Sequence, residues 1–222
     1  VSSGASAQSL EEMAGQMILV GFQGDGVDDA GVAAVRADIA AGRVGGVIYL
    51  RTNVASLSAV SAINQSLMDA ANGLLPFIAI DQEGGLVERL TEAVGFGEVP
   101  SAADVGAGDI ETALRLYDDL AARLHAAGFN VNFGPVVDLA VNPDNPVIVR
   151  FGRAFGVDAD RVVAFARAFL AGHRNNGVLT ALKHFPGHGS SSADSHEGFT
   201  DISSSWRPVE LEPFKGLIGA GL

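Results

Sequence analysis

The chain has 222 residues, of which 48% are apolar and 18% charged, and its formal net charge is −12. This length fits one large domain or two small ones with a real hydrophobic core. The negative charge argues against nucleic acid as a partner, because binding to phosphates requires clustered Lys and Arg. The sequence contains no Cys, which excludes disulfides and thiolate metal sites. Its apolar runs are too short to span a membrane.

The first residues of the chain, VSSGASAQS, are small and mostly polar. We expect residues 1–9 to form a flexible leader, such as a tether left after removal of an export signal. The compartment therefore stays open between the cytoplasm and an exported or lipid-anchored state.

Short apolar runs alternate with longer segments in which apolar residues recur every three or four positions. The short runs predict strands at 16–20, 46–50, 77–81, 130–133 and 178–184. The longer segments predict helices at 28–41, 54–72, 109–127, 158–176 and 209–222. Asp109 fits the start of a helix, and Gly128 fits the left-handed residue that ends one. Strands and helices in alternation are typical of βαβ units and a parallel sheet.

Five strands are too few for a closed (β/α)8 barrel, which takes about 250 residues and eight strands. Either the sheet is open, or the 222 residues are part of a longer chain. We favour the second interpretation, because five strands alone would leave two edges unpaired.

Active sites of parallel α/β folds lie at the C-terminal ends of the strands. Polar residues stand at or after the ends of three of the predicted strands: Asp81, Gln82 and Glu83, then Asp138, then Lys183 and His184. Each of these could simply mark the point where a strand reaches water. Several at one edge of a sheet favour a functional site.

Residues 183–198, which read KHFPGHGSSSADSHEG, contain three of the five histidines. Pro186 and Gly187 exclude a helix that would bring His184 and His188 to one metal ion. The spacing matches none of the usual zinc patterns, and we therefore expect no metal site.

Asp194 and His196 lie two positions apart, so an extended segment directs both side chains to the same side. A carboxylate in contact with the imidazole would orient the ring as a proton donor. The alternative is an Asx turn in a polar loop, with His196 as a surface residue.

The KHFPGHG motif and the following Asp-Ser-His triplet resemble the signature of the glycoside hydrolase family 3 β-N-acetylhexosaminidases, which recycle bacterial cell wall. The segments AIDQEGGLVERL, NVNFGPVVDLAVNPDNPVI and RAFGVD also resemble that family, in the same order. The resemblance covers nearly the whole chain. It implies an α/β fold of the TIM-like (β/α)8 barrel type. Residues 1–222 would supply about the first five βα units, as the N-terminal part of a single catalytic barrel.

The resemblance also implies roles for individual residues. His196 would be the general acid/base and Asp194 its partner. The residues that hold the sugar would be Asp81, Arg89, Arg153, Lys183 and His184. Carboxylates and long cationic side chains are suitable partners for sugar hydroxyls. The implied substrate is a small carbohydrate with a terminal β-linked N-acetylglucosamine, and no cofactor is implied.

A retaining glycosidase also needs a carboxylate nucleophile. The family's nucleophile is an Asp in a later segment, and neither Asp138 nor Asp201 stands in that context. We therefore expect no nucleophile within residues 1–222.

Three alternatives remain open. One is a β-glucosidase of the same family, although those members do not show the Pro-Gly-His-Gly and Asp-Ser-His loop. Another is a phosphorylase, because a histidine acid/base does not repel an incoming phosphate as a carboxylate would. The last is an inactive sugar-binding fragment.

Overall fold

The computed structural model describes residues 9–219. Of the predicted leader, residues 1–8 lie outside the described residues. Ser9 is described and starts a helix instead, since its side chain accepts a hydrogen bond from the Glu12 backbone at 3.1 Å. The Glu12 carboxylate accepts one from the Ser9 backbone in return at 2.8 Å, which completes a capping box.

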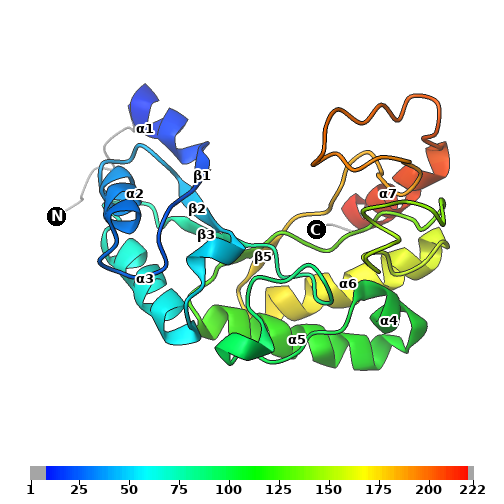
Figure 1. The fold of residues 1–222 in the computed structure, drawn as a ribbon, viewed down its shortest axis with the longest axis horizontal. Coiled ribbons are helices and arrows are strands. Elements are labelled where there is room, and N and C mark those ends of the chain that lie inside the picture. The colour runs from blue at the N-terminus through cyan, green and yellow to red at the C-terminus, as the bar shows by residue number, and fades with distance from the viewer. Residues whose placement is uncertain (1–8, 220–222) are drawn as a thin grey trace.

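The structure alternates strands with helices, as predicted (Figure 1). The strands are β1 (Leu19–Gly21), β2 (Gly46–Tyr49), β3 (Phe77–Ile80), β4 (Val131–Asn132) and β5 (Leu179–Thr180). The helices are α1 (Leu10–Gln16), α2 (Ala30–Ala40), α3 (Leu57–Asp69), α4 (Ala102–Ala107), α5 (Ile110–Ala126), α6 (Ala159–Asn175) and α7 (Glu212–Ile218). Single 3₁₀ turns lie at Arg51–Asn53, Glu92–Val94 and Pro208–Leu211.

The five strands form one parallel sheet in the order β1-β2-β3-β4-β5. The helices follow one another around the outside of this sheet, from α2 and α3 through α5 and α6 to α7 (Figure 1). The predicted parallel α/β fold is confirmed. Within residues 9–219 the sheet has two edges, β1 and β5, so the closed barrel stays a prediction.

The predicted first strand is wrong at its start, because Gln16 belongs to helix α1 and the strand begins at Leu19. The capping box at Ser9 starts a helix in a segment without a clear apolar period. The last predicted helix, 209–222, begins as the 3₁₀ turn Pro208–Leu211, and its residues 220–222 lie outside the described part of the chain.

The helix caps around α5 are confirmed. The Asp109 carboxylate accepts a hydrogen bond from the Thr112 backbone at 2.9 Å and so caps the first turn. Gly128 has a φ of 92°, the left-handed conformation that a glycine adopts at low cost. Helix α5 therefore ends where the sequence predicts.

The hydrophobic core lies between the sheet and these helices. Tyr49 of β2 is fully buried, and its ring meets the edges of Phe22 and Phe129 at centroid distances of 5.0 Å. On the other side of the core, Tyr117 of α5 packs against Phe169 of α6 at 4.8 Å. These aromatic contacts join β2 to the segments beside it and helix α5 to helix α6.

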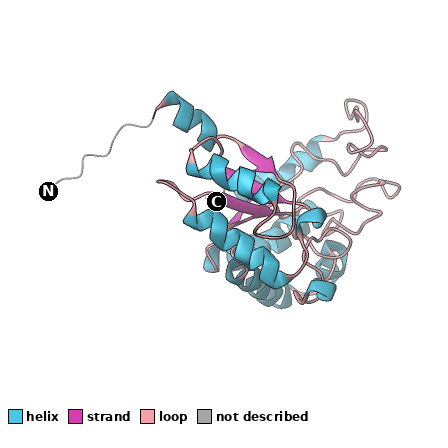
Figure 2. Cartoon of the chain, turned by 60° about the vertical axis from the view of Figure 1, so that its left-hand side comes forward, coloured by secondary structure: helices cyan, strands magenta, loops and turns pink. Residues whose placement is uncertain are grey.

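Long loops gather at one end of the sheet, to the right in Figure 2. They include the segments after β3, β4 and β5, which contain the polar residues at the predicted strand ends. Among residues 9–219, none of the helices combines the length and the apolar character that crossing a membrane would require.

Candidate functional site

All seven predicted site residues line one cavity of about 470 Å³ at the loop end of the sheet. They are Asp81, Arg89, Arg153, Lys183, His184, Asp194 and His196, and the lining also includes Glu83. The structure thus brings together residues from four separate segments of the sequence. Their individual roles stay predictions.

Residues that follow two strands of the sheet, β3 and β5, form the charged floor of the cavity. Asp81 directly follows β3. Lys183 lies three residues beyond β5, where a further parallel bridge joins it to Val136. The Lys183–His184 and Phe185–Pro186 peptide bonds are both cis. Parallel strands end at the same edge, so the Asp81 and Lys183 side chains meet, with Nζ 2.8 Å from Oδ1.

Glu83 is the centre of an ion cluster on this floor. Its two carboxylate oxygens accept hydrogen bonds from Arg153 Nε and Nη2, both at 2.8 Å. Lys183 Nζ lies 2.7 Å from Glu83 Oε1 and also contacts Asp81. Arg89 Nη2 contacts the other Asp81 oxygen at 3.3 Å. Two carboxylates and three cations are therefore connected in one network.

Burial acts on both partners of the central pair. Burial alone would raise the pKa of Glu83, but the hydrogen bond from Arg153 and the charges of Lys183 and Arg153 outweigh it, and the pKa is lowered. Burial would lower the pKa of Arg153, but the Glu83 carboxylate more than compensates and raises it. Both groups are charged at neutral pH. The ion pair is therefore present at neutral pH.

Asp138 holds the next residue of the cavity wall, His184. Its Oδ2 lies 2.6 Å from His184 Nδ1, and Asp138 itself is fully buried. Arg153 Nη2 lies 3.1 Å from His184 Nε2 on the other side of the ring. The imidazole of His184 is therefore fixed between a carboxylate and a guanidinium.

Asp194 and His196 form the predicted pair at the rim. His196 Nδ1 lies 2.7 Å from Asp194 Oδ1, and the same oxygen accepts a hydrogen bond from the His196 backbone at 2.9 Å. The Asx turn and the side-chain pair, which the sequence presents as alternatives, therefore occur together. The backbone and ring hydrogen bonds from His196 lower the pKa of Asp194. The His196 side chain is 76% exposed, which leaves Nε2 accessible.

The loop that carries this pair is anchored by Asn145. The buried Asn145 side chain donates to the carbonyls of His188 and Ser191, at 2.8 and 3.1 Å. The His188 ring then lies between Ser191 Oγ, at 2.7 Å from Nδ1, and Ser195 Oγ, at 3.2 Å from Nε2. Ser195 separates Asp194 from His196. These contacts connect the buried base of the loop to the pair at its tip.

The interpretation of the sequence missed these supporting residues. Glu83 had a signal, since it lies two positions after Asp81 at the same strand end. Asp138 was recognised as a strand-end carboxylate but not as the partner of His184. The hydrogen-bond partners of Asn145, His188 and Ser191, lie 43 and 46 residues further along the chain, and no local sequence pattern predicts such contacts.

The contacts of the histidines bear on metal binding. His184 Nδ1 and His196 Nδ1 are occupied by the carboxylates of Asp138 and Asp194. Within residues 9–219, no three or more His, Asp or Glu side chains form a group suited to a metal ion.

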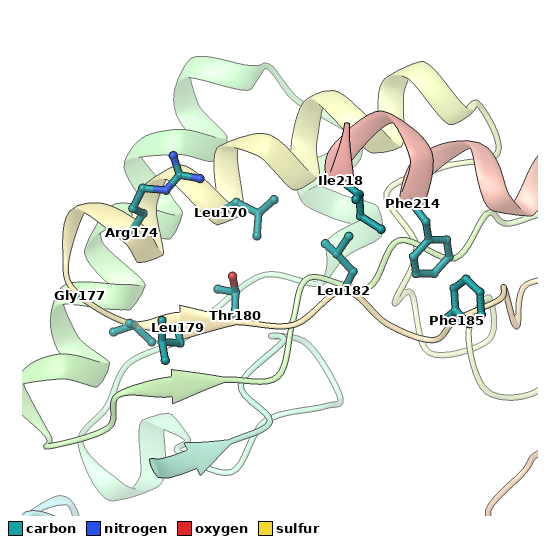
Figure 3. Close-up of a pocket in the computed structure, with 10 residues that line it drawn as sticks. Leu170, Arg174, Gly177, Leu179, Thr180, Leu182, Phe185, Phe214 and Ile218 are labelled. Atoms are coloured by element: carbon teal, nitrogen blue, oxygen red, sulfur yellow. The ribbon is translucent and has the colours of Figure 1, made fainter. Parts of the chain in front are cut away.

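A larger cavity, of about 650 Å³, lies beside the edge strand β5 (Figure 3). Its wall is mainly apolar, and Leu182, Phe185, Phe214 and Ile218 cluster at one end of it. Among the residues 9–219 that line it, Arg174 is the one charged side chain, and none is a carboxylate or a histidine. The smaller charged cavity is therefore the candidate site, because acid–base chemistry requires titratable groups.

Comparison with known proteins gives consistent matches. The family model of the glycosyl hydrolase family 3 N-terminal domain matches residues 9–222. A β-hexosaminidase from Xylella fastidiosa is 35% identical over 218 residues, which cover 92% of this chain and 61% of the relative. The β-hexosaminidase LpqI from Mycobacterium tuberculosis is 41% identical over 131 residues, or 58% of this chain and 33% of that protein. The chain thus spans about three fifths of the Xylella relative's length.

Solved structures show the same fold. A β-N-acetylhexosaminidase from Beutenbergia cavernae superposes with a TM-score of 0.86 at 33% identity, covering 98% of this chain and 66% of that one. NagZ from Neisseria gonorrhoeae, in complex with N-trifluoroacetyl-D-glucosamine, has a TM-score of 0.79 at 26% identity. That match covers 92% of this chain and 60% of the NagZ chain.

Proposed function

Because the chain belongs to glycosyl hydrolase family 3, we propose that its charged cavity binds a terminal β-linked N-acetylhexosamine, such as N-acetylglucosamine. We propose further that the whole protein hydrolyses the glycosidic bond of this sugar with retention of configuration. The observation that carries the proposal is that Asp194 and His196 line the same cavity as Asp81, Arg89 and Lys183. An N-acylated glucosamine is also the ligand named for the NagZ structure above.

The geometry suits His196 as the acid/base. Asp194 binds Nδ1, so Nε2 is the ring atom that exchanges a proton with the substrate. In the first step protonated His196 gives its proton to the leaving oxygen while a carboxylate attacks the anomeric carbon and forms a glycosyl ester. In the second step neutral His196 takes a proton from water, which displaces the carboxylate and releases the sugar.

We assign the attacking carboxylate to none of Asp81, Asp138 and Asp201, and Asp201 is not among the residues that line the cavity. Asp81 is held by Lys183 and Arg89, and Asp138 is fully buried beneath His184. Measurable turnover by residues 1–222 alone would contradict this assignment. Calorimetry with N-acetylglucosamine on the same 222 residues tests binding separately, and no heat of binding would contradict the proposed sugar site.

The acid role of His196 has a direct test in the whole protein. His196→Ala should lower the rate on a disaccharide by about 10²–10⁴-fold, the usual range for general acid–base catalysis. A 4-nitrophenyl glycoside should lose much less, because its leaving group needs little protonation. His125→Ala, an exposed histidine of α5, is the matched control and should change neither rate. Equal losses on both substrates, with glycoside cleavage rate-limiting, would contradict the acid role.

The imidazole of His196 also favours a second candidate reaction, phosphorolysis. An imidazole at the rim of the cavity does not repel an anionic nucleophile such as phosphate, whereas a carboxylate there would. Analysis of products with and without phosphate separates the two reactions, because only phosphorolysis yields a sugar 1-phosphate.

A further inference from the structure

Asp138 is a fully buried carboxylate that does not line the cavity. Three of its contacts are with residues of the segment 183–198, which contains three histidines. Oδ2 lies 2.6 Å from His184 Nδ1. Oδ1 accepts hydrogen bonds from the backbone N–H groups of His184 at 3.3 Å and His188 at 2.8 Å. A buried carboxylate costs free energy unless such donors surround it. Asp138 therefore depends on this arrangement and also fixes it.

The proton of the His184 ring has one position that satisfies every neighbour. Arg153 has only donors, so its contact with His184 Nε2 at 3.1 Å is a hydrogen bond only if Nε2 is the acceptor. The other ring nitrogen, Nδ1, must then carry the proton and donate it to Asp138. A proton on Nε2 would instead bring two donors together, N–H against N–H.

We propose that Asp138 is a positioning residue: it keeps the His184 proton on Nδ1, so that the ring presents Nε2 to the cavity as an acceptor. In the free protein this acceptor binds Nη2 of the Arg153 guanidinium. The same guanidinium also donates two hydrogen bonds to the Glu83 carboxylate. In a complex with the ligand, a hydroxyl can donate to Nε2 in place of Arg153, because this ring nitrogen has one lone pair. The ligand part of this inference rests on the proposed function, but the position of the proton does not.

Asp138→Asn is a suitable probe, because Asn has the same shape but only one accepting oxygen. The backbone N–H groups of His184 and His188 cannot become acceptors, so we expect the amide oxygen to stay with them. The amide NH₂ then faces His184 Nδ1 and forces the proton to Nε2, against Arg153. The variant should therefore retain the fold and change the tautomer.

The test is ¹⁵N NMR of imidazole-labelled residues 1–222, with the His184 signals assigned from a His184→Gln spectrum. We expect the wild type to show a protonated Nδ1 and an unprotonated Nε2 at neutral pH, and Asp138→Asn to show the reverse or a mixture. Asp201→Asn, in an exposed loop, is the control and should leave the His184 signals unchanged. A wild-type spectrum with Nε2 protonated would overturn the inference. That spectrum decides the question even if the variant does not fold.

Binding gives a second measurement, which tests the ligand part of the inference. Calorimetry with N-acetylglucosamine should show a loss of about 2- to 10-fold in affinity for a folded Asp138→Asn, the equivalent of one hydrogen bond between uncharged groups. Unchanged affinity together with a changed tautomer would overturn the ligand part. If the wild type shows the expected tautomer but binds no sugar, the proposed function fails and the proton assignment stands.

Discussion

Removing the charge of Glu83 tests whether the ion cluster holds the cavity together. Glu83→Gln keeps the size of the side chain but offers one accepting oxygen in place of a carboxylate that binds Arg153 twice and Lys183 once. The amide NH₂ must face one of these cations as a second donor. Arg153 then loses its counterion while its side chain is only 7% exposed.

The magnitude follows from this burial. Breaking a buried ion pair by removing one partner costs about 3–5 kcal/mol, because the other charge is left uncompensated. For a chain of this size each kcal/mol lowers the Tm by about 2–4 °C, so we expect a decrease of roughly 6–20 °C. Lys183 and Asp81 still pair with each other, which favours the lower half of the range.

Urea unfolding followed by circular dichroism measures this loss. The matched control is Glu111→Gln, which breaks an exposed i,i+4 pair with Arg115 on α5. Such surface pairs contribute only about 0.3–0.5 kcal/mol, so the control should lie within the error of the wild type. Equal, small losses in both variants would refute the reasoning that burial makes the Glu83 pair strong.

The same pair has a pH signature. The pKa of Glu83 lies below its ordinary value of 4.5, so the folded state binds this proton less readily than the unfolded state does. The stabilisation of the folded state by the ionised Glu83 carboxylate is therefore complete above pH 4.5. It is lost as the pH falls through the pKa that Glu83 has in the folded state. The difference in unfolding free energy between wild type and Glu83→Gln should narrow in acid, and a constant difference would contradict this account.

Three further predictions concern stability and the loop. Burial lowers the pKa of His173 from 6.5 to about 4, so the wild type should lose up to about 3 kcal/mol of stability as the pH falls between those values. His173→Gln should lack this loss in urea titrations, and an equal slope would contradict the prediction. Asn145→Ala should cost about 1–3 kcal/mol and speed amide exchange across residues 188–191, whereas Asn175→Ala, on an exposed face of α6, should not. Gly189→Ala should lower stability by about 1–3 kcal/mol, because its Cβ would lie 1.7 Å from the Leu139 carbonyl oxygen, and an unchanged Tm would show that the loop can move aside.

The parts of the fold that depend on local pattern could be predicted from the sequence. Apolar periodicity gave the five strands in order, and Asp109 and Gly128 marked the ends of α5 because caps are set by neighbouring residues. Strand ends located Asp81 and Lys183, since parallel strands end at one edge. The short helix Leu10–Gln16 was missed because a capping box, not an apolar stripe, starts it.

The parts that depend on long-range contacts could not be predicted. Glu83 and Arg153 are 70 residues apart, and nothing in either neighbourhood shows that their side chains form a pair. Asn145 likewise stands in a turn, and the local sequence explains its contacts with residues 147 and 148. It does not explain the contact with His188 in the segment 183–198. Such contacts arise only when the sheet brings distant loops together.

The charges beside the cavity cancel, although the chain as a whole carries −12. The cavity lining contains three carboxylates, Asp81, Glu83 and Asp194, and three cations, Arg89, Arg153 and Lys183. The proposed substrate, a saccharide without ionised groups, would thus meet a cavity lining with almost no net charge, in which polar groups are already oriented. Its affinity should hardly respond to ionic strength, because dissolved ions screen buried pairs only weakly.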